Sequence, residues 1–176
     1  MTESTSATSR PRGAQSSRKA LYTPEERARR DATAWTLVQG ILAPLQFAVF
    51  LVSLALVLRF LLTGAGEEAA AISVVLKTLV LYTIMVTGSI WEKVVFGRWL
   101  LAPAFFWEDM VSFLVIALHT AYVVMLFGGI GTPGEQMAVA LAGYAVYVVN
   151  AAQFLLKLRR ARLDGALDGD PAGEPA

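Results

Sequence analysis

The segment SIWEKVVFGRWLLAPAFFWEDM, residues 89–110, joins two long apolar runs and carries acids on both sides of the joint. Two Trp-Glu pairs, at 91/92 and 107/108, flank a short apolar connection. If the runs cross a membrane and the connection turns at its surface, the acids Glu92, Glu108 and Asp109 lie at one depth. Placing a carboxylate at a membrane boundary costs free energy, and such a group usually faces the interior of the helix bundle. We therefore expect the three acids to face a common space.

Composition places the chain among membrane proteins. Of its 176 residues, 56% are hydrophobic and 16% are charged, and the mean hydropathy is +0.55. These values are too apolar for a soluble domain of this size. The absence of cysteine excludes disulfides and thiolate chemistry, and the single histidine excludes a multi-histidine metal site. We expect a small polytopic membrane protein without a bound metal and without affinity for nucleic acid.

Four apolar segments predict the fold. They lie near residues 35–62, 69–91, 106–127 and 136–157, and each reaches the roughly 20 residues that cross a bilayer core. The expected architecture is an all-α, integral membrane four-helix bundle over residues 23–163. The polar tails, residues 1–22 and 164–176, are expected to be disordered.

Two Thr-Pro motifs predict helix starts. TPEE at residues 23–26 has the pattern of a capping box with proline at the first helical position. It should begin a basic helix that runs into the first span. TPGE at residues 132–135 repeats the pattern before the fourth span.

The distribution of basic residues predicts the topology. The connections TGAGEE (63–68) and GGIGTPGEQ (128–136) carry no Lys or Arg, and only Arg59 lies near that side. The positive-inside rule places both termini and the central hairpin in the cytoplasm. The residues that support this placement are Arg27, Arg29, Arg30, Lys93, Arg98, Lys157, Arg159, Arg160 and Arg162.

Each predicted span carries polar residues on one face, and these should line the bundle interior. By span, they are Gln39, Gln46 and Ser53; Lys77, Gly88 and Glu92; Glu108, Asp109, Ser112 and His119; Tyr147, Asn150, Gln153 and Lys157. At 1.5 Å per residue, Lys77 lies about 14 Å and His119 about 20 Å from the respective ends of their spans. The two should therefore share the outer half of the membrane core. A cytoplasmic layer should surround a cavity that opens toward the cytoplasm. Its expected members are Glu92, Lys93, Glu108, Asp109, Gln153 and Gln39.

Structural interpretations of the same residues remain open. Glu92 with Lys93, or Asp109 with Arg98, could form interfacial ion pairs, and Lys77 could extend to the membrane surface. The glutamines, Ser53 and Asn150 could simply hydrogen-bond between helices. Trp35, Trp91, Trp99 and Trp107 are typical of an interfacial aromatic belt.

Several strings resemble the vinyl bacteriochlorophyllide hydratase family over about residues 22–163. They are AWTLVQGILAPLQF (34–47), the segment from Lys77 to Met110, LHTAY (118–122) and NAAQFLLKLRRARL (150–163). The resemblance implies addition of water to the 3-vinyl group of chlorophyllide a, giving the 3-(1-hydroxyethyl) derivative. It also implies the inner or intracytoplasmic photosynthetic membrane of a phototrophic bacterium. The implied partners are the magnesium chlorin, water, membrane lipid and other enzymes of bacteriochlorophyll biosynthesis.

Hydration of a conjugated vinyl group needs a proton donor and a base, but no redox cofactor. We expect Glu108 or Glu92 to donate the proton and Asp109 to act as the base. His119 would relay protons or ligate the magnesium of the pigment.

The pigment also needs binding groups. Arg98, Lys93 or Lys157 could meet its propionate, while Lys77, Asn150 and Gln153 should line its cavity.

Two other function classes fit parts of the sequence. A four-helix protein with one buried histidine could carry chlorin, or help to assemble photosynthetic complexes, without changing the pigment. A small transporter is less attractive, because the four spans show no inverted repeat and no broken helix.

Overall fold

The structure, a computed structural model, describes the backbone of residues 21–168 and the side chains as far as residue 162. Every regular element in this part of the chain is a helix. The five helices are α1 (Pro24–Ala32), α2 (Ala34–Thr63), α3 (Glu67–Phe96), α4 (Phe106–Gly128) and α5 (Pro133–Asp168). Four of them, α2 to α5, are long and apolar enough to cross a membrane. The predicted all-α membrane fold is confirmed.

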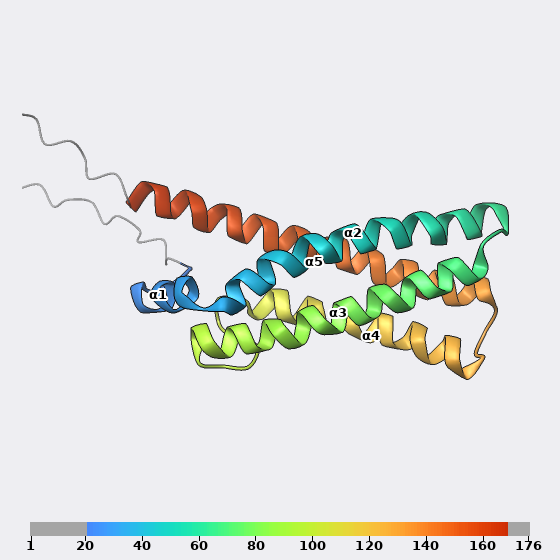
Figure 1. The fold of residues 1–176 in the computed structure, drawn as a ribbon, viewed down its shortest axis with the longest axis horizontal. Helices are drawn as coiled ribbons and strands as arrows, with labels where there is room; N and C mark the ends of the chain where they lie inside the picture. Colours follow the sequence, from blue (N-terminus) through green and yellow to red (C-terminus); the bar gives the residue numbers. More distant parts are fainter. Residues whose placement is uncertain (1–20, 169–176) are drawn as a thin grey trace, which may run out of the picture.

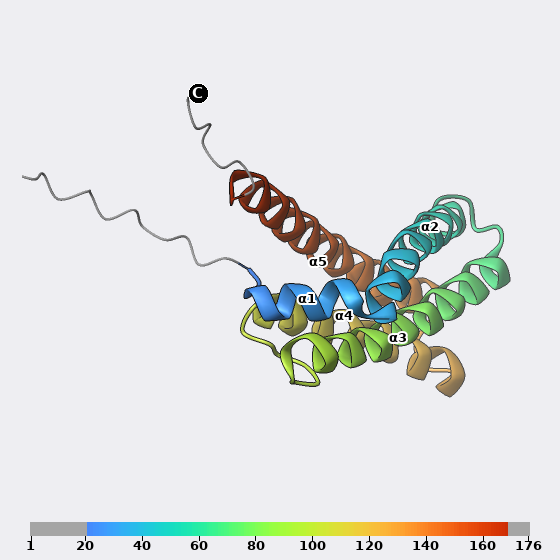
Figure 2. The same ribbon diagram turned by 60° about the vertical axis from the view of Figure 1, so that its left-hand side comes forward.

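The four long helices form two antiparallel hairpins. Helix α2 packs along α3, and α4 packs along α5 (Figure 1). The hairpins meet where α2 contacts α5 and where α3 contacts α4. Short α1 lies across one end of the bundle, beside the connection between α3 and α4 (Figure 2). We call this the α1 end, and the opposite end the far end.

The helix boundaries differ from the predicted ones in two places. The expected helix from residue 24 into the first span is wrong, because α1 stops at Ala32. Thr33 is extended, with φ −90° and ψ 137°, and its hydroxyl accepts the Trp35 N–H at 3.3 Å, which caps α2. Helix α5 continues past residue 163 to Asp168. The predicted disorder of residues 1–20 and 169–176 lies outside the described residues.

Both predicted capping boxes are present. The Thr23 hydroxyl accepts the Glu26 N–H, and the Glu26 carboxylate accepts the Thr23 N–H. The same reciprocal pair joins Thr132 and Glu135, at 2.7 and 3.3 Å. These bonds satisfy backbone donors that the first helical turn leaves free.

The bundle is polar inside and apolar outside. Lys77 and His119 are 0% exposed, whereas Leu62 and Phe127 are 82% and 76% exposed. An isolated bundle in water could not keep such a surface, but hydrocarbon solvates it. The polar stripes predicted on the four spans therefore face inward, among small apolar core residues such as Val57.

Close packing of α4 on α5 depends on one glycine. A Cβ on Gly143 of α5 would lie 2.9 Å from both Cε1 and Nδ1 of His119 on α4. This approach is too short for any side chain, so the imidazole occupies the space that Gly143 leaves.

We expect Gly143→Ala to lower the free energy of unfolding by about 1–3 kcal/mol, the usual cost of overpacking. The test is thermal unfolding of the purified protein in detergent micelles. Gly40→Ala is the matched control, because nothing lies within 4 Å of its added Cβ and alanine favours helix. Equal stability of the two variants would contradict this account of the packing.

Candidate active site within the membrane bundle

Two acids hold the connection between α3 and α4. The Leu101 N–H donates to Asp109 Oδ2 at 2.7 Å, and the Ala102 N–H donates to Glu92 Oε2 at 3.1 Å. Leu101 has φ +59°, a left-handed conformation that costs a non-glycine residue about 1–2 kcal/mol. This turn brings two successive N–H groups to the two acids, and these hydrogen bonds offset its cost.

The same two acids contact each other. The carboxyl groups of Glu92 and Asp109 are within hydrogen-bonding reach, and their residues are only 5% and 3% exposed. A hydrogen bond between two carboxyl groups needs a proton on one of them. The common space predicted from residues 89–110 therefore exists for this pair.

Glu108 lies in the same layer with a different partner. Its Oε2 accepts a hydrogen bond from Lys157 Nζ at 2.5 Å. Lys157 also donates to the Ala104 carbonyl, and its ammonium lies 4.9 Å from the Phe105 ring centre. Glu108 is thus one half of a largely buried ion pair.

The two ion pairs considered from the sequence do not form. Lys93 Nζ donates to the Gly97 carbonyl at 3.0 Å and lies over the Trp99 ring. Arg98 is exposed. Among the described residues, the ion pairs are Arg30–Asp31 and Lys157–Glu108. The predicted binding residues Lys93 and Arg98 therefore lie at the rim of the α1 end and not inside it.

Aromatic side chains close the bundle at the α1 end. Buried Tyr22 stacks on Phe96 and contacts Phe105, which in turn stacks on Phe154 of α5. Burial raises the pKa of the Tyr22 phenol above its ordinary value, so the ring stays neutral. Arg29 ties α1 to α3 through a 2.8 Å hydrogen bond to the Val95 carbonyl. This end of the bundle therefore has an apolar cover beside its acidic layer.

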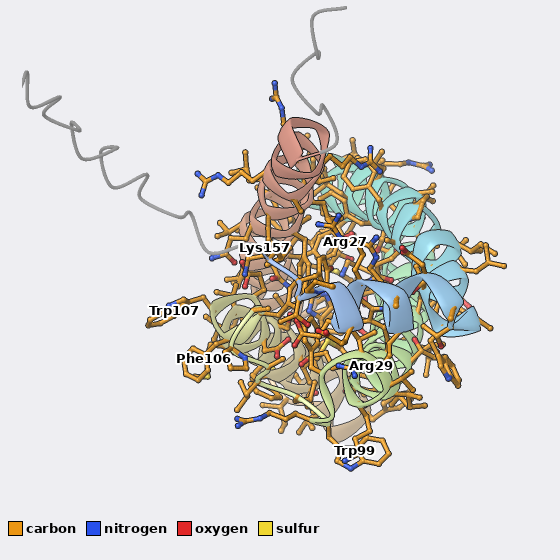
Figure 3. All side chains as sticks on the ribbon, turned by 90° about the vertical axis from the view of Figure 1, so that its left-hand side faces the viewer. Arg27, Arg29, Trp99, Phe106, Trp107 and Lys157 are labelled. Atoms are coloured by element: carbon orange, nitrogen blue, oxygen red, sulfur yellow. The ribbon has the colours of Figure 1, made fainter. Side chains whose placement is uncertain are left out.

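Tryptophans at the α1 end have two different environments. Trp99 and Trp107 are 60% and 72% exposed and point away from the bundle (Figure 3), as a belt requires. Trp91 instead packs edge-on against Phe96 and Phe105, and its indole N–H donates to Thr36 at 2.9 Å. The belt interpretation is wrong for Trp91.

A second polar layer lies deeper in the bundle. Lys77 Nζ lies 2.8 Å from His119 Nε2, and His119 Nδ1 lies 2.7 Å from the Val115 carbonyl. Since a carbonyl only accepts, Nδ1 carries the ring proton and Nε2 accepts from the lysine. The rings of Tyr144 and Tyr147 lie 5.1 and 4.4 Å from the amine. The predicted shared layer is confirmed, and extension of Lys77 to the membrane surface is wrong.

Some interior polar groups link helices as expected. Gln39 donates to Thr87, and the Ser53 hydroxyl bonds with Tyr144 at 2.5 Å and with Ser73 at 2.8 Å. These bonds join α2 to α3 and α5.

Gln46 departs from this pattern. Gln46 is 2% exposed, yet neither its amide nitrogen nor its oxygen has a hydrogen-bond partner among the described residues. Asn150 Oδ1 and Gln153 Oε1 share this condition. From the sequence, Asn150 and Gln153 are expected to bind the pigment, whereas Gln46 is expected only to link helices. Its seven-residue spacing from Ser53 was the available signal.

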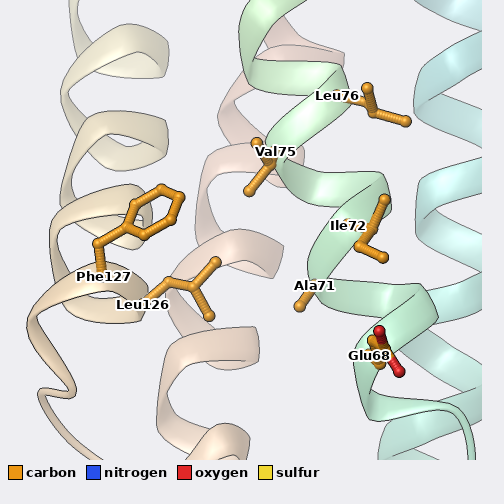
Figure 4. A pocket seen from close by; sticks show the side chains of 7 residues that line it. All are labelled: Glu68, Ala71, Ile72, Val75, Leu76, Leu126 and Phe127. Atoms are coloured by element: carbon orange, nitrogen blue, oxygen red, sulfur yellow. The ribbon is translucent and has the colours of Figure 1, made fainter.

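An apolar pocket lies elsewhere, away from these polar layers. It holds about 290 Å³ between α3 and the end of α4 (Figure 4), and its lining includes Ile72, Val75 and Phe127. Its single acid, Glu68, is exposed at the far end. No group of three or more His, Cys, Asp or Glu within the described residues could hold a metal ion. The buried carboxyl groups and the buried histidine lie in the polar interior and not in this pocket.

Fold and site together define a small four-span membrane protein with an enclosed layer of carboxyl groups. A family model described as 2-vinyl bacteriochlorophyllide hydratase matches residues 22–160, and the chain belongs to this family. No solved structure matches the chain.

Two curated relatives carry the same name. The protein from Rhodobacter capsulatus is 71% identical over 150 residues, which cover 85% of this chain and 87% of the relative. The protein from Cereibacter sphaeroides is 69% identical over 144 residues, which cover 82% and 89%. The chain is a hydratase, a hydro-lyase, of bacteriochlorophyll biosynthesis, and the function expected from the resemblance is confirmed at this level.

The Lys157–Glu108 pair makes a stability prediction. Lys157→Met leaves the Glu108 carboxylate buried without its cation, which should lower the free energy of unfolding by about 3 kcal/mol. The double variant Lys157→Met/Glu108→Leu should recover most of this loss, because no unpaired charge remains. Denaturant titration in micelles measures both. A double variant less stable than the single one would show that the pair itself stabilises the fold.

Proposed function

We propose that this chain adds water to the 3-vinyl group of chlorophyllide a, giving the 3-(1-hydroxyethyl) derivative; an older ring numbering calls this position 2. The contact between the buried Glu92 and Asp109 carboxyl groups carries the proposal. Such a pair can hold one proton and one negative charge side by side, which are the acid and the base that hydration needs.

In this mechanism Glu92 gives its proton to the terminal carbon of the vinyl group. The two π electrons form the new C–H bond, and the positive charge develops on the inner carbon, where the macrocycle delocalises it. Water forms the C–O bond at that carbon, and Asp109 takes the proton that this water loses. Transfer of this proton from Asp109 to Glu92 restores the pair, so one water is added and nothing else is consumed.

Glu108 supports the same step in a different way. Its carboxylate is bonded to the Lys157 ammonium, so it carries a negative charge and has no proton to give. A fixed anion near a cation-like transition state lowers the barrier. Of the two donors considered from the sequence, we therefore propose Glu92.

For His119 we propose the proton relay in place of magnesium ligation. Its Nε2 already bonds with Lys77, and ligation would require this bond to break. His119 follows Asp109 by ten residues on α4, or about 15 Å. It therefore acts behind the reacting layer and not on the vinyl group.

The pigment is proposed to enter from the membrane interface at the α1 end. A flat macrocycle with a free propionate has an apolar body and one charged edge. Lys93 and Arg98, exposed at this rim, are suited to meet the carboxylate, while the ring reaches the acids beneath. Other enzymes of the pathway are the proposed source and recipient of this poorly soluble pigment.

We further propose that the α1 end faces the cytoplasm of a phototrophic bacterium, across its inner or intracytoplasmic membrane. The clustering of basic residues at this end supports the orientation. Because the chain has no cysteine, single substitutions can report on it. In intact spheroplasts a membrane-impermeant maleimide should label Ala65→Cys at the far end and leave Glu25→Cys unlabelled. The reverse pattern would invert the topology.

The carboxyl pair is tested by neutral replacements. Glu92→Gln and Asp109→Asn should each reduce turnover by about 10²- to 10⁴-fold, as expected for loss of a general acid or base. Membranes are incubated with chlorophyllide a in oxygen-18 water, and the pigment is followed by chromatography, absorption and mass.

Glu68→Gln is the control, because this acid lies on the same helix but at the far end. Full turnover in both Glu92→Gln and Asp109→Asn would remove the pair from the mechanism. Unchanged pigment that co-purifies with the folded wild type would instead indicate a chlorin carrier.

A further inference from the structure

Three interior amides have unmet hydrogen-bonding capacity. The unpartnered atoms are Nε2 and Oε1 of Gln46, Oδ1 of Asn150 and Oε1 of Gln153. Gln46 is 2% exposed and Asn150 is 9% exposed. A buried polar atom without a partner costs about 1–3 kcal/mol. Such a group of unpartnered atoms in a native interior indicates a binding site for a ligand.

The register of α2 against α5 brings these amides together. Ser53 bonds to Tyr144, and the rings of Phe50 and Tyr147 lie 4.9 Å apart. Gln46 is four residues from Phe50 toward the α1 end. Asn150 is three residues from Tyr147 in the same direction. Spacings of three and four preserve the face of a helix, so Gln46 and Asn150 lie level on facing sides.

Gln153 extends this group toward the acids. It follows Asn150 by three residues on the same face and precedes Lys157 by four, and Lys157 bonds to Glu108. The amides therefore lie between the Lys77–His119 layer and the carboxyl layer.

The hydrogen-bond network determines which atom of Asn150 is free. The Ser112 hydroxyl donates its proton to the Glu108 carbonyl at 2.8 Å. It can therefore only accept from Asn150, so Nδ2 is the atom 2.7 Å away and Oδ1 is the atom without a partner. The free atoms are then three acceptors and one NH₂ donor.

This set needs a ligand that can donate hydrogen bonds to its acceptor oxygens. The oxygens at the edge of chlorophyllide a are ketone, ester and carboxylate oxygens, which only accept hydrogen bonds. Water offers two donors and two acceptors, and the hydroxyl group that hydration creates is also a donor. We propose that Gln46, Asn150 and Gln153 form a water-binding site, which supplies and orients the nucleophile.

This role rests on the proposed hydration and extends it. Water held by the acceptor oxygens presents its lone pair away from them, toward the cation that forms at the vinyl group. The site also receives the new hydroxyl group of the product. The three amides are positioning residues for the nucleophile, and the carboxyl pair moves the protons.

The first measurement is made on the full-length protein in lipid bilayers, with no pigment present. Magic-angle-spinning NMR detects transfer of magnetisation from water protons to the ¹⁵N side-chain amides. We expect transfer to Gln46 and Asn150 in the wild type, and loss of the Asn150 signal in Gln46→Leu. Absence of transfer in the wild type would overturn the site, whether or not the protein hydrates its substrate.

Kinetics give the second measurement. Gln46→Leu and Gln153→Leu should lower kcat by about 10- to 100-fold and leave the KM for chlorophyllide a unchanged, because water and not pigment loses its contacts. Gln39→Leu is the matched control, since its amide already bonds to Thr87, and it should keep both kcat and the water signals. A raised KM with unchanged kcat would assign the amides to the pigment and overturn the proposal.

The two measurements separate failure of this site from failure of the proposed function. A hydrated amide group in a wild type that does not convert chlorophyllide a would refute the hydration and leave the water site standing. Partly exposed Gln153 offers the variant with the smaller risk to folding.

Discussion

The two hydrogen bonds from the Leu101 and Ala102 N–H groups to Asp109 and Glu92 hold the rest of the site in place. They join the end of α3 to the start of α4 through the turn between them. Each carboxyl group loses its hydration when it accepts one of these bonds. A buried carboxylate without such donors would not stay buried. The turn brings Glu92 beside Asp109, and it leads directly into Ala104, whose carbonyl accepts from Lys157, and Phe105, which stacks on Phe154.

Much of this arrangement was readable from the sequence. Apolar length predicted the four spans, and the periodicity of polar residues predicted which faces point inward, because hydrocarbon admits few alternatives. The shared depth of Lys77 and His119 was predicted from the helical rise per residue alone. Helix caps followed from local Thr-Pro-x-Glu patterns, since both partners lie within one turn.

Pairing between helices was harder to predict. Periodicity gives the face and depth of a residue, but the partner depends on how helices turn about their axes, so Glu108 was not assigned to Lys157. The rim position of Lys93 and Arg98 and the extended Thr33 also depend on the turn between elements. The seven-residue spacing of Gln46 from Ser53 indicates that its side chain faces inward. That its amide has no partner among the described residues depends on the side chains of the neighbouring helices, which this spacing does not give.

Main-chain N–H groups hold the acids of this site. This determines which changes the connection between α3 and α4 can accept. Any amino acid except proline supplies an N–H at positions 101 and 102, so the two bonds themselves do not depend on the side chains there. The side chains are constrained for other reasons, because Ala102 is fully buried and Leu101 has a left-handed backbone. Pro103 disfavours the helical conformation at Ala102, independently of what either neighbour packs against. The carboxyl groups therefore keep their places through the length and backbone conformation of the connection, and an insertion or deletion there would displace both acids at once.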